Sequence, residues 1–110
     1  MHTLRRFRRK LLKMNIYTTS FHPERPDEPV PWYEVVGDEI FTTLYHPTHP
    51  QEPASWFVIR DSKIFTSDDH PTNPGEQAAW FEINKNLIYP SEDHPTHPDN
   101  DLPWFEIREI

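Results

Sequence analysis

The chain has 110 residues, which is enough for one domain and leaves no room for a second. It contains no cysteine, which excludes disulfides, zinc–thiolate centres and thiol nucleophiles and is compatible with the reducing, cytoplasmic location that we expect. The net charge of −7 conceals a division, because residues 1–13 carry 6 of the 11 basic side chains and no acid, leaving 5 basic and 18 acidic side chains elsewhere. This remainder, at −13, disfavours nucleic acid as a partner of the domain itself.

Residues 1–14 are predicted to be a basic extension, either disordered or folded as a short helix. Leu4, Phe7 and Leu11 are spaced as on one face of a helix, so an amphipathic helix that touches an anionic surface is one interpretation. The interpretation that we favour is that Met14 is the true start, since the first repeat begins two residues later. No secretory or transmembrane segment is predicted.

Residues 15–110 contain a four-fold internal repeat with a period of 24 residues. Two landmarks recur in every copy without insertion or deletion: a histidine followed by proline, at His22, His46, His70 and His94, and a tryptophan, at Trp32, Trp56, Trp80 and Trp104. Because both landmarks keep one period, the four copies are expected to be equivalent in space, with one small supersecondary unit used four times.

Each junction between two copies predicts a β-hairpin. A strand with tryptophan, a second aromatic residue and valine or isoleucine is followed, after four residues, by a strand that begins with isoleucine. The central pairs of the four-residue segments fit two-residue turns, and they are Gly37-Asp38, Asp61-Ser62 and Lys85-Asn86. In the second hairpin the expected pairs are Ile59 with Ile64 and Phe57 with Thr66 on one face, and Trp56 with Ser67 and Val58 with Phe65 on the other.

The two ends of the repeat array complement each other. The first copy opens with a strand at residues 16–19 that has no preceding partner, and the last copy ends with a strand at residues 104–107 that has no following partner. Pairing the two strands completes a fourth hairpin and removes the exposed edges of an open sheet. We therefore predict an all-β fold in residues 15–110, a closed pseudo-four-fold ring of four β-hairpins with eight short strands.

The four tryptophans have two interpretations. Indoles on one face could stack on sugar rings, cations or nucleobases. We favour the interpretation that each tryptophan is the packing anchor of its copy, because an apolar residue precedes it by two positions every time. The residue after each tryptophan is also aromatic. Since adjacent strand residues point to opposite faces, one aromatic of each pair is expected to face the core, which leaves the other free to face outward.

The loop histidines His22, His46, His70 and His94 are expected at corresponding points around the symmetry axis. Neutral imidazoles bind zinc, copper or nickel, and two copies add a second histidine three positions later. This gives a possible metal set from copies that face each other across the ring, namely His46, His49, His94 and His97. We favour the alternative that His-Pro starts a rigid turn in which the ring caps backbone groups or stacks on an aromatic residue, with no cofactor.

The repeat unit W-[FY]-x-[IV]-x-x-x-x-I-[FY], followed by a proline-containing loop, resembles the repeat of small bacterial four-fold β-flower proteins over residues 15–110. The resemblance implies four hairpins around an axis and a bacterial or phage setting, and it implies no activity and no functional residues. The loops of this chain depart from the family pattern, because they are longer and contain His-Pro where the family has shorter loops with Gly-Pro.

No catalytic signature is present in the chain. It lacks the motifs of serine hydrolases, metalloproteases, phosphate loops and dinucleotide sites, and its carboxylates are scattered over the loops, so we do not expect an enzyme. We predict a non-catalytic binding or interaction module that presents four equivalent His-Pro loops to an unknown protein or small ligand, with the four loop histidines and the four tryptophans as binding residues. The alternative prediction is a histidine-based metal-binding protein with a site near the pseudo-symmetry axis.

Overall fold

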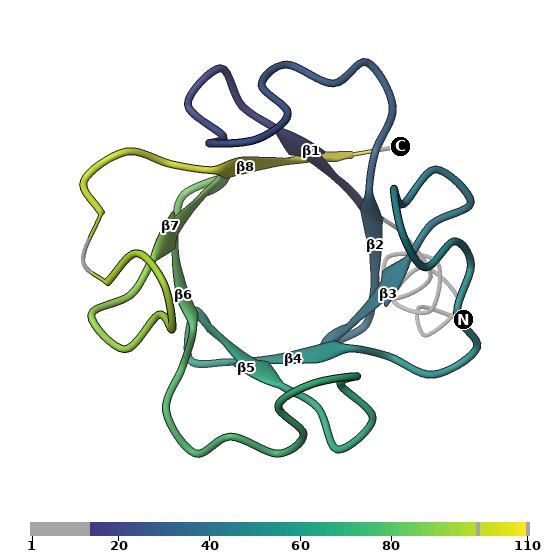
Figure 1. Ribbon diagram of the computed structural model, residues 1–110, viewed down its shortest axis with the longest axis vertical. Helices are drawn as coiled ribbons and strands as arrows, with labels where there is room; N and C mark the ends of the chain where they lie inside the picture. The colour runs from purple at the N-terminus through teal and green to yellow at the C-terminus, as the bar shows by residue number, and fades with distance from the viewer. Residues whose placement is uncertain (1–13, 99, 110) are drawn as a thin grey trace, which may run out of the picture.

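The computed structural model describes residues 14–98 and 100–109, and it is all-β, as predicted. The strands are β1 (Met14–Thr18), β2 (Tyr33–Val36), β3 (Glu39–Thr42), β4 (Phe57–Arg60), β5 (Lys63–Thr66), β6 (Phe81–Asn84), β7 (Leu87–Pro90) and β8 (Phe105–Glu109). Each strand pairs antiparallel with its neighbours in chain order, and β8 returns to β1 to close the barrel. Figure 1 shows the strands as a ring, with the long loops arranged around its outside.

The hairpins have the register that the sequence predicts. In the second hairpin, Ile59 lies opposite Ile64, and β4 and β5 are joined by Asp61 and Ser62 alone. Both turn residues have positive φ, 52° and 62°, as a type I′ turn requires. Because a two-residue turn fixes which residues pair, it also fixes which alternate side chains of the hairpin point into the barrel.

The two ends of the chain form the fourth hairpin. β1 and β8 pair over five residues, from Met14 opposite Glu109 to Thr18 opposite Phe105, which confirms the predicted closure. β1 begins at Met14, one residue before the predicted domain boundary. Adjacent hairpins are joined by two or three residue pairs. The backbone N–H of each tryptophan extends the contact by donating to the backbone carbonyl of an isoleucine in the preceding hairpin, at 2.9–3.0 Å.

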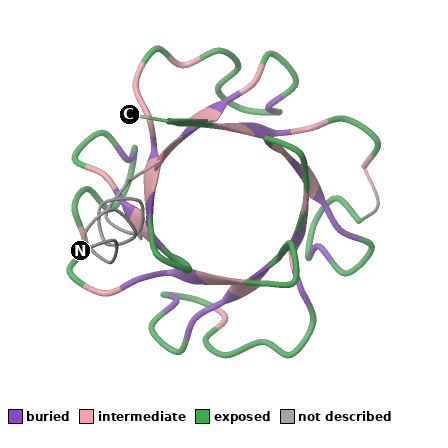
Figure 2. Ribbon diagram, turned by 180° about the vertical axis from the view of Figure 1, so that it is seen from behind, coloured by how far each residue is buried: buried purple, intermediate pink, exposed green. Residues whose placement is uncertain are grey.

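Isoleucine and aromatic side chains fill the interior of the barrel. The most buried isoleucines are 1–3% exposed, and they are Ile16, Ile40, Ile64 and Ile88. Figure 2 shows that buried residues follow the strands, whereas the tight turns and most of each outer loop are exposed. No helix that is long and apolar enough to cross a membrane occurs in the described parts of the chain. Toward the loops, the barrel interior continues into the tryptophan and histidine side chains.

Candidate binding site on the barrel axis

Each His-Pro loop is folded around its own histidine. Nδ1 of the ring accepts the backbone N–H groups of the residues two and three positions later, at 3.1–3.3 Å in all four loops. In the third loop, for example, Thr72 and Asn73 donate to His70. A neutral imidazole carries one proton, so a ring whose Nδ1 accepts must carry that proton on Nε2. The loop conformation therefore fixes the tautomer of each histidine and leaves it with an Nε2–H donor.

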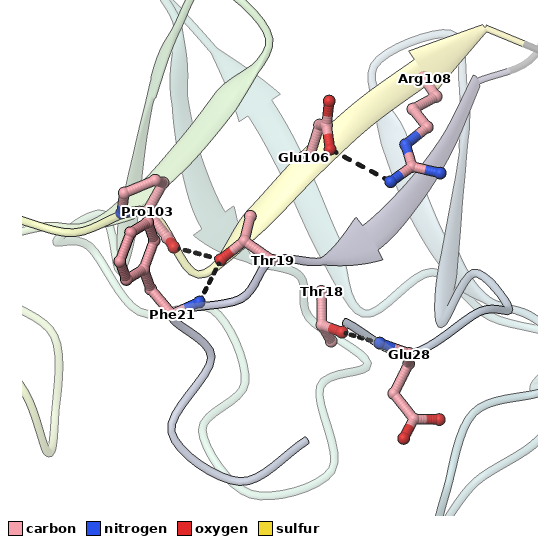
Figure 3. A network of polar contacts seen from close by, with 7 residues as sticks. All are labelled: Thr18, Thr19, Phe21, Glu28, Pro103, Glu106 and Arg108. Atoms are coloured by element: carbon pink, nitrogen blue, oxygen red, sulfur yellow. Dashed lines mark hydrogen bonds and ion pairs between the residues drawn. The ribbon is translucent and has the colours of Figure 1, made fainter. Parts of the chain in front are cut away.

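In each copy a hydroxyl side chain bonds the loop to the segment just before the neighbouring strand. Thr19 Oγ1 donates to the carbonyl oxygen of Pro103 at 2.5 Å and accepts the backbone N–H of Phe21 at 3.1 Å (Figure 3). The same pair of bonds is made in the other copies by Thr43, Ser67 and Ser91. Because these bonds recur in all four copies, every histidine is held at the same place on the loop side of the barrel.

The four loop histidines and the four tryptophans form a closed circle of aromatic contacts, here called the Trp–His ring. Each histidine lies edge-on against the tryptophan of its own copy, with ring centroids 4.9–5.0 Å apart. It also lies tilted against the tryptophan of the preceding copy, at 5.6–5.9 Å. For His22 these partners are Trp32 and Trp104, so the alternation continues across the two ends of the chain.

A second set of aromatic side chains lies within the Trp–His ring, here called the aromatic square. Its members are the first residues of β2, β4, β6 and β8, namely Tyr33, Phe57, Phe81 and Phe105. Neighbouring members pack edge to face, with centroids 5.9–6.3 Å apart. Each member also lies edge-on against one loop histidine at 5.0–5.1 Å, so the square supports the ring from inside the barrel.

A cavity of about 290 Å³ lies between these side chains on the barrel axis. Its lining includes all four tryptophans, the aromatic square, the four most buried isoleucines and the histidines His22, His70 and His94. The exposed loop residues Glu24 and His97 also line it, so the cavity runs from the buried isoleucines to the loop surface. Apart from the histidines, Glu24 is the one acidic or basic side chain among the described lining residues, and the walls are otherwise mostly aromatic and aliphatic.

Each member of the aromatic square and the loop histidine against it form one corner of the square, and the four corners are not identical. The hydroxyl of Tyr33 lies 3.2 Å from Nε2 of His46, and burial raises the pKa of Tyr33, so this hydroxyl stays neutral and accepts the Nε2–H proton. The other three histidines face phenylalanine, which offers no acceptor. These three histidines line the cavity, whereas His46, whose Nε2 is occupied, does not. The cavity therefore has three corners with N–H donors and one corner filled by a hydroxyl.

The loop histidines are uncharged at neutral pH. Burial, with a smaller contribution from His49, lowers the pKa of His46 to about 4. Burial together with His97 lowers the pKa of His94 to about 4 in the same way. Burial also lowers the pKa of the other two, where a nearby glutamate opposes it; these pairs are His22 with Glu24 and His70 with Glu76. The Trp–His ring thus presents neutral donors rather than positive charges.

The histidine set suggested for a metal is not brought together in the structure. His49 and His97 are exposed, and each lies near the histidine of its own loop, with ring centroids 6.4 and 6.3 Å apart. They pack against Trp56 and Trp104 of the Trp–His ring, and His97 also lines the loop end of the cavity. Within residues 14–98 and 100–109, no three histidine, aspartate or glutamate side chains are grouped so that they could hold a metal ion. In all four loop histidines Nδ1 accepts backbone N–H groups of the same loop, which is the capping contact of the rigid-turn interpretation.

The tryptophans combine the two roles that the sequence left open, because they are packed and they also line the cavity. Trp32, Trp56 and Trp104 are buried, and Trp80 is half-buried. The interpretation that one aromatic of each pair is free to face outward is wrong, since both members line the same cavity. The physical reason is that β4 begins at Phe57, so Trp56 precedes the strand and the alternation of strand faces does not extend to it.

Sequence reasoning missed the aromatic square as part of the site. The sequence shows that the residue after each tryptophan is aromatic, but its pattern indicates no binding role for that residue. The signal that could have found it is the single tyrosine, Tyr33, in a position that is phenylalanine in the other three copies. Comparison of the chain with protein-family models, with curated proteins and with solved structures gives no match.

Proposed function

We propose that the protein is a non-catalytic binding module that takes a small ligand into the cavity on the barrel axis. The observation that supports this proposal is the cavity itself, about 290 Å³ in volume and lined by both the Trp–His ring and the aromatic square. Concave, mostly apolar sites with a few directed polar groups are the usual form of small-molecule sites in proteins. On this proposal the four His-Pro loops form the entrance of this one cavity and the part of its wall nearest the loop surface, rather than four separate binding surfaces.

The tautomer of the histidines argues for binding rather than catalysis. A general base needs a free lone pair near the reacting proton, but each Nδ1 lone pair is directed at two backbone N–H groups of its own loop. The Nε2 atoms that face the cavity carry protons and can only donate. These rings are suited to holding an acceptor in place.

The same tautomer weighs against the alternative of a metal site. Zinc, copper and nickel bind an unprotonated ring nitrogen, and to offer Nε2 a histidine such as His70 would have to move its proton to Nδ1. That proton would then point at the N–H groups of Thr72 and Asn73, which lie 3.3 and 3.1 Å away. Metal binding through Nε2 would therefore break two hydrogen bonds in every loop that took part.

A thermal-shift screen of a chemically mixed small-molecule library, followed by calorimetric titration of the compounds that stabilise the protein, tests this function. Trp80→Ala is the variant that removes part of the cavity wall, chosen because Trp80 is less buried than the other tryptophans. Leu44→Ser is the matched control, because Leu44 is 61% exposed on an outer loop and does not line the cavity. We expect compounds that stabilise the wild type to lose their effect in Trp80→Ala and keep it in Leu44→Ser. Hits that keep their affinity in Trp80→Ala would place binding elsewhere and contradict the proposal.

A further inference from the structure

Three histidine rings line the buried part of the cavity, and the exposed side chains of Glu24, Thr96 and His97 line its loop end. His22, His70 and His94 are each 8% exposed, so more than nine tenths of each residue is buried. Within the described residues, the Nε2–H of these three rings has no protein acceptor, whereas that of His46 bonds to Tyr33. No buried polar side-chain atom in the described residues is both sealed from solvent and unpaired. The three Nε2–H groups therefore open onto the cavity that their rings line.

The direction of these N–H groups restricts the ligand. An N–H bond presents its positive end, so the three that face the buried part of the cavity disfavour an ammonium group there, whereas the carboxylate of Glu24 lies at the exposed loop end. A purely apolar ligand would displace water from the three donors and leave them unpaired, which weakens binding. A ligand that carries an oxygen acceptor would satisfy at least one donor, while its apolar part contacts the aromatic and isoleucine walls.

From this arrangement we propose that the cavity selects an apolar ring that carries a carbonyl or carboxylate oxygen, received by Nε2–H of His22, His70 or His94. This inference rests on the proposed function and adds the chemical class of the ligand. The flat walls formed by Trp32, Trp80 and their counterparts suit an aromatic or other planar ring. The shared chemistry is an oxygen acceptor at the edge of that ring, which an amide and an acid both provide.

Four probes of similar size separate the possibilities: benzamide, benzoate, toluene and benzylammonium, each titrated calorimetrically into the wild-type protein at neutral pH. We expect benzamide or benzoate to bind about tenfold or more tightly than toluene and than the ammonium probe, as one satisfied donor implies. The comparison of benzamide with benzoate distinguishes a neutral carbonyl from a carboxylate as the preferred acceptor.

Removal of the histidine donors provides the variant. In His70→Asn the amide oxygen can take the position of Nδ1, and no atom replaces Nε2–H. The triple variant His22→Asn, His70→Asn, His94→Asn should abolish the preference for benzamide or benzoate over toluene, and His70→Asn alone, which leaves the other three loops intact, should reduce it. Phe57→Tyr is the control and should keep the preference, because its hydroxyl accepts from His70 and still offers its own O–H to the cavity.

The outcomes separate the ligand class from the function. If toluene binds as tightly as benzamide and benzoate, or if the ammonium probe binds tightest, the oxygen-acceptor proposal is overturned while the cavity remains a binding site. If the triple variant keeps the full preference, the histidine corners are not the source of selectivity, and the proposal fails. If no probe binds and the library screen yields no cavity-dependent compound, both this inference and the proposed function are overturned.

Discussion

The hydroxyl oxygen of Tyr33 lies 3.2 Å from Nε2 of His46, and this contact distinguishes one corner of an otherwise four-fold arrangement. Tyr33 begins β2, and His46 lies in the loop after β3, so the contact joins a strand to the loop that covers it. In the other three copies a phenylalanine ring lies 5.0–5.1 Å from the corresponding histidine ring in the same edge-on arrangement. One oxygen atom therefore determines whether the histidine donor is occupied or faces the cavity.

Exchanging tyrosine and phenylalanine at this position should change stability in a predictable direction. Phe57→Tyr should be neutral or stabilising by up to about 1 kcal/mol, because the new hydroxyl accepts from His70 in a geometry that the fold already contains. Tyr33→Phe should destabilise by about 1 kcal/mol, because it leaves the Nε2–H of His46 without a partner. Urea denaturation of both variants measures the two effects. A clear loss of stability in Phe57→Tyr would show that the four corners are not equivalent in shape.

The role of Nδ1 can be separated from that of the ring by two substitutions of His70. In His70→Asn the amide oxygen takes the position of Nδ1 and can accept the N–H groups of Thr72 and Asn73, as asparagine does in turns. In His70→Gln the oxygen extends beyond that position and the two N–H groups lose their acceptor. Both variants lose the aromatic packing, so we expect His70→Asn to be the more stable by about 1 kcal/mol in chemical denaturation. Equal destabilisation would mean that the ring contacts with Trp80 dominate.

Acidification should destabilise the barrel through the loop histidines. The pKa of His46 is about 4 in the folded protein, below its ordinary value of 6.5, so between these values the unfolded chain binds more protons than the folded one. The free energy of unfolding then rises with pH in this interval, and the stability present above pH 6.5 is lost progressively as the pH falls toward 4. Protonation also places a proton on Nδ1, where it faces two backbone N–H groups.

Urea denaturation at several values between pH 6.5 and 5 measures this slope above the range in which exposed carboxylates titrate. The double variant His46→Asn, His94→Asn removes the two histidines whose pKa is lowest, and it should show a shallower dependence on pH. An unchanged slope in the double variant would assign the acid sensitivity to other groups.

The hairpins and their closure could be predicted from the sequence because they depend on spacing alone. A period of 24 residues, two-residue turns and unpaired strands at both ends define the order and register of eight strands. The cavity could not be predicted in this way. Trp56 lies just before β4, where strand alternation no longer applies, although its backbone N–H and carbonyl still bond to Ile40 and Ser67.

The corner between Tyr33 and His46 shows a second limit. The sequence shows one tyrosine among three phenylalanines, but not that its hydroxyl reaches a histidine 13 positions away. That contact depends on the tilt of the strands and on how far the loop folds over the barrel. The tautomer of His46 likewise follows from two N–H groups within its own loop, which no pattern of residue types specifies.

The left-handed residue in the His-Pro loops gives a prediction that is independent of the cavity. Asp27, Gln51 and Gly75 occupy equivalent positions with φ of 55°, 53° and 62°, and only glycine adopts this conformation without strain. Gln51→Gly should therefore stabilise the protein by about 1 kcal/mol, as measured by thermal or urea denaturation. Gly75→Ala should destabilise it by a similar amount, since the added Cβ would also lie 2.9 Å from the side chain of Asp68. The reverse order of stabilities would show that the loops relax out of this conformation.

Closure of the barrel by the chain ends predicts that the connection between hairpins can be moved. Met14 lies opposite Glu109 in the way that Lys63 lies opposite Arg60 at a natural turn, so an Asn-Gly link from Glu109 to Met14 should form the fourth two-residue turn. A circular permutant with this link, opened between Asp61 and Ser62, should fold to the same barrel and unfold cooperatively. A permutant opened inside β5, after the buried Ile64, is the control and should fail to fold, because both halves of a paired strand would become chain ends. If the first permutant is unfolded while the unpermuted chain is stable, pairing of β1 with β8 is not equivalent to the other hairpins, and the four-fold account of the barrel is wrong.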